Sequence, residues 1–374
     1  MIPRFYNLDK LVKRGKVLLV FGPRRVGKTT LLTEFLQKNK LKYNSVSGDN
    51  ISVANILNSR DFKLILDFAE GYDIIAIDEA QQIKGIGMGL KILIDNNPEL
   101  IVIATGSSSF KLSQQTGEPL TGRKRTAILF PIAQMELLDQ YNKFELKQKL
   151  DEFLIYGSYP EIVMEKSNKE KKQLLREFVD SYLLKDVFAL ENLRSPKQLI
   201  TLLKLLAFQI GSLVSLNELA SQLRMDIKTV QRYLDILEKS FIIKSLGGFS
   251  RNLRNELKNK NKYYFWDIGI RNALINQFNT LQDRTDTGFL FENFLVMERI
   301  KYNTYKDNFS DLYFWRNYAG QEIDLIEERD GKLFGFEIKY SNPKKKSPPT
   351  DWKKAYTNSE YKIITKENYL DFIT

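Results

Sequence analysis

Residues 16–36 read KVLLVFGPRRVGKTTLLTEFL, and this stretch decides the fold of the N-terminal part of the chain. Its first residues, 16–22, form an apolar run that ends on a glycine, which is typical of a fully buried strand. The apolar side chains that follow recur at the spacing of an amphipathic helix: Leu31, Leu32, Phe35 and Leu36. A buried strand that passes through a tight turn into a helix predicts one unit of an α/β sheet.

Three further apolar runs lie downstream, at residues 73–77, 100–104 and 127–130, and helical or polar stretches separate them. Short buried strands that alternate with helices are typical of a parallel sheet covered by helices on both faces. From residue 136 to residue 206 the pattern becomes helical. We therefore predict an α/β core that is followed by a helical segment.

The turn between the first strand and its helix, residues 22–29, matches the phosphate-binding motif G-x-x-x-x-G-K-[ST]. Its glycines allow backbone N–H groups to face phosphate oxygens, and the helix N-terminus adds a favourable dipole. Lys28 would reach the β- and γ-phosphates of ATP, and Thr29 would ligate Mg²⁺. The predicted nucleotide-binding residues are Gly22, Pro23, Arg24, Arg25, Val26, Gly27, Lys28, Thr29 and Thr30.

Two adjacent carboxylates end the next predicted strand, in the sequence YDIIAIDEAQQ of residues 72–82. Asp78 would hold the magnesium ion through water, and Glu79 would polarise the attacking water. The strand at 100–104 ends in hydroxyl groups, so Thr105 or Ser107 would orient this water, or would only form the turn that ends the strand.

Arg123 is the candidate for an arginine that neutralises charge in the transition state, with Arg125 as a second choice. The alternative is that both are solvated basic residues beside a strand. The sequence leaves open whether Arg123 acts within its own subunit or on a neighbour in a homo-oligomer.

At this point the sequence resembles a known group. The segments GPRRVGKTT, DEAQ and ATGSS are similar to those of prokaryotic AAA-type P-loop ATPases. Residues 156–161 (YGSYPE), 181–187 (SYLLKDV) and 264–269 (YFWDIG) resemble a subfamily in which this core precedes a C-terminal domain of unknown function. The resemblance covers nearly the whole chain. It implies an additional-strand P-loop fold but not a substrate.

The composition limits the chemistry that the chain can perform. Cysteine and histidine are absent, which excludes thiol and imidazole chemistry and leaves oxygen ligands for any metal, as suits Mg²⁺, Mn²⁺ or Ca²⁺. The 57 Lys and Arg residues outnumber the 46 Asp and Glu residues, giving a net charge of +11 that favours DNA as a partner. A solvated basic surface is the alternative. No membrane-spanning run or signal-peptide pattern is present, so we expect a cytoplasmic location without membrane binding.

Residues 215–239 contain two short amphipathic segments separated by a break at 224–226, which is the helix-turn-helix pattern. The exposed side of the second segment would carry Lys228, Thr229, Gln231 and Arg232. Such side chains contact phosphates and base edges in a major groove, but winged helices also serve only as packing modules.

A second cluster of carboxylates is predicted in residues 321–340, QEIDLIEERDGKLFGFEIKY. Asp330-Gly331 predicts a two-residue hairpin turn, and pairing of Arg329 with Lys332 would place Asp324 opposite Glu337 and Glu322 opposite Lys339. A divalent cation, Mg²⁺ or Mn²⁺, would remove the repulsion between the opposed acids, and Lys339 would assist catalysis. This pattern resembles restriction-endonuclease-like nucleases, with Glu292 as a third, helix-borne metal ligand. An exposed hairpin face with a Glu322–Lys339 surface pair is the alternative.

We therefore expect four parts: a P-loop ATPase core with a parallel sheet (1–135), a helical lid (136–206), a winged helix (207–250) and a restriction-endonuclease-like α/β domain (251–374). One functional hypothesis is an ATPase coupled to DNA binding and metal-dependent DNA cleavage. Another is an ATP-controlled switch for DNA or protein in which the C-terminal domain is not catalytic.

Overall fold

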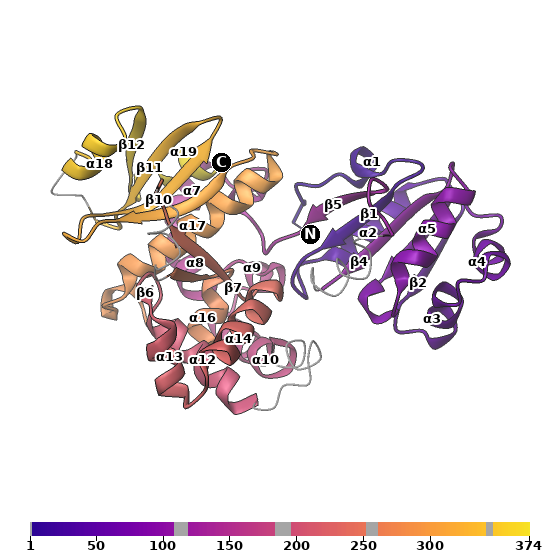
Figure 1. The fold of residues 1–374 in the computed structure, drawn as a ribbon, viewed down its shortest axis with the longest axis horizontal. Helices are drawn as coiled ribbons and strands as arrows, with labels where there is room; N and C mark the ends of the chain where they lie inside the picture. The colour runs from indigo at the N-terminus through magenta and orange to yellow at the C-terminus, as the bar shows by residue number, and fades with distance from the viewer. Residues whose placement is uncertain (1, 108–118, 184–195, 252–260, 342–346) are drawn as a thin grey trace. The chain divides into compact units, whose positions relative to one another are not determined.

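The computed structural model describes residues 2–107, 119–183, 196–251, 261–341 and 347–374 (Figure 1). Its contacts divide the chain into two compact units. The N-terminal unit comprises Arg4–Pro131 with Lys239–Phe241, and the C-terminal unit comprises Met1–Pro3, Ile132–Glu238 and Ile242–Thr374. The boundary near residue 131 lies close to the predicted end of the core.

The N-terminal unit alternates strands and helices. Its elements are α1 (Leu8–Leu11), β1 (Val17–Phe21), α2 (Lys28–Lys38), β2 (Tyr43–Ser47), α3 (Ile51–Asn58), α4 (Phe62–Ala69), β3 (Ile74–Asp78), η1 (Ala80–Gln82), α5 (Ile86–Asn96), β4 (Ile101–Gly106) and β5 (Lys124–Ile128). Polar residues cap several of these helices: Asn50 accepts from the backbone at the start of α3, and Asp61 does so for α4.

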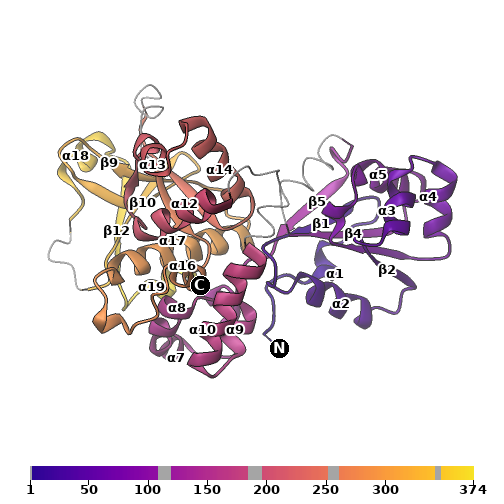
Figure 2. The ribbon, with the colours of Figure 1, turned by 90° about the horizontal axis from the view of Figure 1, so that it is seen from below.

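All five strands pair in parallel in the order β2-β3-β4-β1-β5. The predicted parallel sheet is therefore confirmed, and β4 is inserted between β1 and β3 as an additional strand. Strands β1, β3 and β4 are almost wholly buried, because α1 and α2 cover one face of the sheet and α3, α4 and α5 the other (Figure 2). The carboxyl ends of β1, β3 and β4 meet at one edge, where parallel α/β sheets bind ligands.

The C-terminal unit begins with helices and continues into a mixed sheet. Its elements are η2 (Gln134–Leu137), α7 (Lys143–Gln148), α8 (Leu150–Tyr156), α9 (Pro160–Met164), α10 (Asn168–Glu177), the π-helix η3 (Phe178–Leu183), α12 (Pro196–Phe208), β6 (Leu213–Val214), α13 (Leu216–Leu223), α14 (Ile227–Lys239), β7 (Ile243–Gly248), β8 (Asn261–Phe265), α16 (Ile268–Leu274), η4 (Leu281–Asp283), α17 (Thr287–Tyr305), β9 (Asp311–Arg316), β10 (Glu322–Arg329), β11 (Lys332–Ile338), α18 (Thr350–Ala355), β12 (Ser359–Ile364) and α19 (Tyr369–Ile373).

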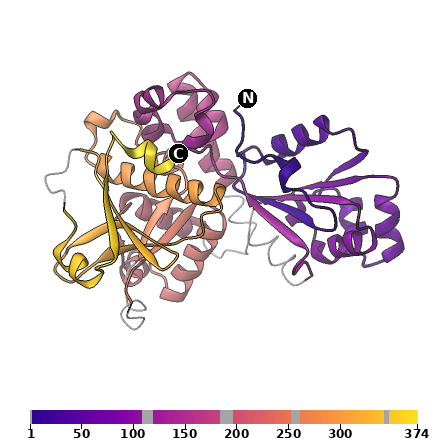
Figure 3. The same ribbon diagram turned by 90° about the horizontal axis from the view of Figure 1, so that it is seen from above.

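One seven-stranded sheet, in the order β12-β11-β10-β9-β7-β8-β6, runs through this unit. β6 and β7 pair with β8, and the parallel pairing of β7 with β9 joins these three strands to the remainder. The expected boundary at residue 250 therefore falls inside a hairpin, between β7 and β8, and does not separate two sheets. Helix α17, orange in Figure 3, lies against the sheet and is buried along most of its length.

The two helices expected at 215–239 are present as α13 and α14. Arg224 ends α13 in a left-handed conformation, and Asp226 accepts hydrogen bonds from Thr229 at the start of α14. The apolar stripe of α14 is buried: Val230, Tyr233, Leu234, Ile236 and Leu237.

The predicted hairpin at Asp330-Gly331 is confirmed by the pairing of Arg329 with Lys332. Both turn residues have positive φ, 50° and 71°, as a type I′ turn requires. This turn sets the register of β10 and β11 that brings their carboxylates together. None of the helices in the described ranges is both long and apolar enough to cross a bilayer.

Candidate functional site

The backbone of the loop that follows β1 lies close to a neighbouring segment and turns through left-handed conformations. Gly22 has φ of 150°, and a Cβ at this position would lie 2.0 Å from the carbonyl oxygen of Leu129, so only glycine fits. Arg25 and Gly27 also have positive φ, and Gly27 forms the N-cap of α2. Left-handed residues next to a helix N-terminus turn backbone N–H groups toward one point, which is the geometry of an anion-binding concavity.

Lys28 is buried in the first turn of α2. Its ammonium donates to the carbonyl oxygens of Gly22 and Pro23, at 2.9 and 2.8 Å, and so lies inside the loop. Arg4 supports the same loop from outside, because its guanidinium donates to the carbonyl oxygens of Val26 and Phe130. Thr30 is exposed beside Thr29, and Arg24 is half-buried.

The loop and the end of β3 meet at Asp78. Thr29 Oγ1 donates to Asp78 Oδ2 at 2.7 Å, and the Thr105 hydroxyl donates to Asp78 Oδ1. A threonine hydroxyl beside a strand-end carboxylate is the set of oxygen donors that suits Mg²⁺ held with phosphates. The residues present therefore fit Mg²⁺-ATP.

Glu79 follows Asp78 in a left-handed conformation, with φ of 50°. Gln81 donates to the Glu79 carboxylate and lies 3.2 Å from Ser107 Oγ, so one amide links the ends of β3 and β4. The backbone N–H of Glu79 is also 3.4 Å from Thr105 Oγ1. Thr105 thus contacts Asp78 and the Glu79 backbone, and Ser107 contacts the amide that binds Glu79, while Ser108 lies outside the described residues.

Arg123 lies at the opposite edge of the sheet from its own phosphate loop. Val17 pairs with Lys124 and Phe21 with Ile128, so Arg123 precedes the first pair whereas the loop follows the last. Five strand residues span about 13 Å. Arg123 instead forms an ion pair with Asp95, with Nε 2.6 Å from Oδ1. In this arrangement Arg123 does not lie near the phosphate loop of its own chain, and Arg125 donates to the Leu11 carbonyl oxygen.

The carboxylates predicted in the second site also come together. Continuing the pairing of Leu325 with Phe336 places Asp324 opposite Glu337, and Asp324 Oδ2 accepts from the backbone N–H of Ile338 at 2.7 Å. Lys339 Nζ lies 2.7 Å from Glu337 Oε1 and 3.7 Å from Asp324 Oδ2. The expected Glu322–Lys339 pair is wrong, because Glu322 binds Lys262 and Arg316 instead.

Lys262, on β8, also belongs to this site, although no sequence motif indicates it. Its Nζ is 2.9 Å from Glu292 Oε1 and 2.5 Å from Glu322 Oε1, and the Tyr264 hydroxyl also donates to Glu292. Burial alone lowers the pKa of Lys262, but the charges of Glu292, Asp324 and Glu322 outweigh it and raise this pKa above its ordinary value. Burial, with the charge of Asp324, raises the pKa of Glu292 to about 7.

These residues do not fit a divalent cation. No group of three or more carboxylates in the described part of the chain is arranged to hold a metal ion. A cation such as Mg²⁺ needs several oxygen ligands, and here the ammonium of Lys262 lies between Glu292 and Glu322. Among the described residues, the structure thus shows no metal-ligand arrangement of Glu292, Asp324 and Glu337, for which the sequence predicts Mg²⁺ or Mn²⁺.

The exposed side of α14 carries three of the four side chains expected there: Lys228, Gln231 and Arg232. Thr229 is half-buried, and its hydroxyl donates to Asp226 at 2.6 Å. The predicted basic face is therefore present, but Thr229 supports the start of the helix.

Two of the segments that carry the family resemblance meet inside the C-terminal unit. Asp267 accepts hydrogen bonds from the backbone N–H groups of Ser158 and Ile270, at 2.7 and 3.1 Å. These two hydrogen bonds connect the turn after α8 to the start of α16. A Cβ on Gly157 would lie 2.1 Å from Asp267 Oδ1. These motif residues have a structural role, and the third segment, 181–187, lies mostly outside the described residues.

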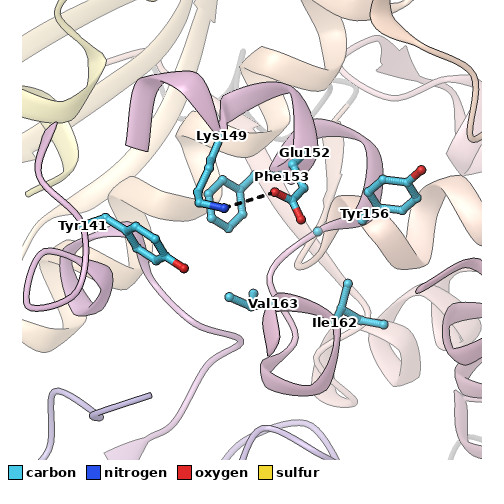
Figure 4. Close-up of a pocket in the computed structure, with 8 residues that line it drawn as sticks. Tyr141, Lys149, Glu152, Phe153, Tyr156, Ile162 and Val163 are labelled. Atoms are coloured by element: carbon cyan, nitrogen blue, oxygen red, sulfur yellow. Dashed lines mark ion pairs between the residues drawn. The ribbon is translucent and has the colours of Figure 1, made fainter. Parts of the chain in front are cut away.

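A small pocket adjoins this turn, lined by α8 and α9, with Lys149 and Glu152 3.6 Å apart on its wall (Figure 4). Its cavity volume of about 10 Å³ is enough for roughly one water molecule. A cavity of this size has no room for a nucleotide.

Comparison with protein families divides the chain into three matched regions. Residues 14–138 match a family model described as an AAA domain. Residues 147–281 and 287–371 match two different domains of unknown function, DUF8612 and DUF4143. A C-terminal region of unknown function thus follows the AAA domain, as the sequence resemblance implied.

Curated relatives span most of the chain. An uncharacterized protein of Mycobacterium tuberculosis is 27% identical over 338 residues, which cover 89% of this chain and 72% of the relative. An uncharacterized protein of Methanocaldococcus jannaschii is 25% identical, with 83% and 72% covered. One from Haemophilus influenzae is 24% identical, with 74% of each chain covered.

Two solved structures are distantly similar. The replication initiator DnaA bound to AMPPCP and single-stranded DNA has a TM-score of 0.28 and 16% identity, covering 60% of this chain and 83% of its own. A signal-transduction ATPase (STAND) protein of Pyrococcus horikoshii has a TM-score of 0.28 and 12% identity, covering 76% and 43%. The AAA match, the phosphate loop and the parallel sheet together identify residues 14–138 as a nucleotide-binding P-loop ATPase domain.

Proposed function

We propose that this chain hydrolyses ATP in an Mg²⁺-dependent reaction and that its nucleotide state controls binding to DNA. The observation that carries the first part is the hydrogen-bonded connection from the phosphate loop to both strand-end acids. Thr29 and Thr105 both donate to Asp78, the backbone N–H of Glu79 donates to Asp78 as well, and Gln81 donates to both Glu79 and Ser107.

Each residue has a separate role in this proposal. Lys28 would hold the β- and γ-phosphates against the backbone of the loop, and Thr29 and Asp78 would hold Mg²⁺. Mg²⁺ held by these two residues would supply positive charge that offsets the negative charge of the phosphates. Glu79 orients the attacking water and accepts its proton, while Gln81 fixes the position of the Glu79 carboxylate. Because Arg123 lies at the opposite edge of the sheet, it would assist only the site of a second copy.

Replacement of Glu79 by glutamine is expected to separate binding from hydrolysis. The amide keeps the size of the side chain but cannot accept a proton, so the single-turnover rate should fall by about 100- to 10,000-fold. Binding of a fluorescent ATP analogue should be nearly unchanged. Glu70→Gln, at the exposed end of α4, is the matched control and should behave as wild type. Turnover by Glu79→Gln at the wild-type rate would remove Glu79 from the mechanism.

The DNA part of the proposal rests on the segment from α12 to β8. One helix, a short strand, two helices and a hairpin follow each other there, and β8 pairs with both β6 and β7. This succession supports a winged helix with α14 as the helix that enters a major groove. Lys228 and Arg232 on the exposed side of α14 would supply the phosphate contacts, in line with the net charge of +11.

The double variant Lys228→Ala/Arg232→Ala is therefore expected to weaken DNA binding. Loss of two phosphate contacts should reduce the slope of log K against log salt by about 2, measured by anisotropy of a labelled duplex. Lys197→Ala/Lys204→Ala, which removes the same charge from exposed positions of α12, is the control. Equal losses in both variants would indicate non-specific attraction, and no binding at low salt would favour a protein partner instead.

A further inference from the structure

Four carboxylates from three different elements converge on two lysines in the C-terminal unit. Glu292 comes from α17, Glu322 and Asp324 from β10, and Glu337 from β11. We call these residues with Lys262 and Lys339 the lysine–carboxylate cluster. Lys262 is only 1% exposed, and it belongs to β8, in the hairpin that follows α14. The cluster therefore connects the helix-turn-helix region to the rest of the seven-stranded sheet.

Every carboxylate in the lysine–carboxylate cluster has a partner within the chain. Lys262 binds Glu292 at 2.9 Å and Glu322 at 2.5 Å, and Arg316 adds a contact to Glu322 at 3.3 Å. Asp324 accepts from a backbone N–H, and Lys339 binds Glu337. Buried charges of one sign require compensation, and the lysines supply it without an external ion.

The position of Lys262 also opposes entry of a metal ion. Glu292 already accepts a hydrogen bond from the Lys262 ammonium group. A metal ion bound by Glu292 would lie next to this ammonium group, and the two positive charges would repel each other. The buried oxygen Oε2 of Glu337 has no hydrogen-bond partner among the described residues. Mg²⁺ keeps several waters and takes one or two carboxylates. Every carboxylate of this cluster already contacts a lysine ammonium, at 2.5 to 3.7 Å, so a second cation would meet a positive charge at each of them.

We propose that Lys262 takes the place of a divalent cation in the lysine–carboxylate cluster. The cluster is a network of ion pairs that contains no metal ion, and it connects the β7–β8 hairpin to α17 and β10. It does not cleave phosphodiester bonds. Its function is to fix the orientation of the helix-turn-helix segment relative to the sheet, independently of the ATP site.

The test is metal rescue of Lys262→Ala. Without the ammonium group, the negative charges of Glu292, Glu322 and Asp324 surround a cavity and lose the cation that compensates them. The variant should therefore unfold at a lower temperature than wild type. Mn²⁺ should then enter the cavity and restore stability. At a free concentration about 100 times Kd, the gain corresponds to a rise of roughly 5–10 °C in the transition. Wild type should show no rise with Mn²⁺.

All three tryptophans, Trp266, Trp315 and Trp352, lie in the C-terminal unit, so their fluorescence reports its unfolding without a signal from the nucleotide site. Lys301→Ala is the matched control, because Lys301 is similarly buried but binds the single carboxylate Glu298, at 2.7 Å. Mn²⁺ should not rescue Lys301→Ala. Absence of rescue in a folded Lys262→Ala protein would overturn the proposal.

A second experiment uses the wild-type protein and does not depend on whether Lys262→Ala folds. Titration of nucleotide-free wild type and Asp324→Asn with Mn²⁺, followed by electron paramagnetic resonance, should show the same absence of a bound equivalent in both proteins. One equivalent bound by wild type and lost in Asp324→Asn would overturn the proposal. So would metal-dependent cutting of DNA by wild type that Asp324→Asn abolishes.

Discussion

Lys28→Ala is expected to abolish both nucleotide binding and turnover, with a fall in kcat/KM of at least about 100- to 1,000-fold. The ammonium group lies inside the phosphate loop, 2.9 and 2.8 Å from two loop carbonyl oxygens. It is therefore held where the β- and γ-phosphates would lie, and alanine removes the positive charge without providing another. Phosphate release and the affinity for a fluorescent ATP analogue measure the two effects.

Lys38→Ala is the matched control for this experiment, because Lys38 ends the same helix but is exposed. It should leave kcat/KM unchanged. The expected loss of both nucleotide binding and turnover in Lys28→Ala also differs from the result expected for Glu79→Gln, which should still bind the nucleotide. Wild-type affinity for ATP in Lys28→Ala would contradict the assignment of the loop as the phosphate-binding site.

Arg299→Ala is expected to lower the free energy of unfolding of the C-terminal unit by about 3–5 kcal/mol. Arg299, on α17, forms a two-point ion pair with Glu327 on β10, at 2.6 and 2.9 Å, and donates to the carbonyl oxygen of Phe372. The Glu327 side chain is 0% exposed. Alanine would leave its charge buried without a cation, and this uncompensated charge is the source of the large effect.

Urea denaturation followed by tryptophan fluorescence would measure this change in the C-terminal unit. Arg299→Met/Glu327→Leu is the matched control, since removal of both charges leaves no unpaired group and should recover most of the stability. Lys143→Ala, which breaks the exposed pair with Asp371, should change little. A change below about 1 kcal/mol in Arg299→Ala would show that Glu327 is compensated by other groups.

The parts of the structure that the sequence predicts are those encoded by adjacent residues. The loop at 22–29 and the acids at 78 and 79 each follow a run of apolar residues, so strand and site are visible in one window. Asp330-Gly331 likewise specifies a turn with positive φ at both positions, and this turn determines the register of β10 and β11.

Contacts between distant residues could not be predicted in this way. Lys262 meets Glu322 across 60 residues of sequence, and Arg4 reaches the Phe130 carbonyl across 126. Neither lysine nor arginine carries a local signal for such a partner. The parallel pairing of β7 with β9 is a backbone contact, for which side-chain patterns give no direct evidence.

Gln81 and Thr229 show a second limit of prediction from the sequence. Both lie within segments that the sequence singles out, but their roles depend on side-chain direction. Gln81 points to Glu79 and Ser107, whereas Thr229 turns back to Asp226. Periodicity predicts which face of an element is buried, and it does not specify which polar group a side chain binds.

The most direct test of the account is steady-state phosphate release by the purified chain with saturating Mg²⁺-ATP, compared with the same protein in excess EDTA and with Glu79→Gln. We predict turnover by wild type that is lost in EDTA and lost in Glu79→Gln. No release by a wild-type protein that binds ATP, or release that persists in Glu79→Gln, would contradict the proposed hydrolysis at the phosphate loop.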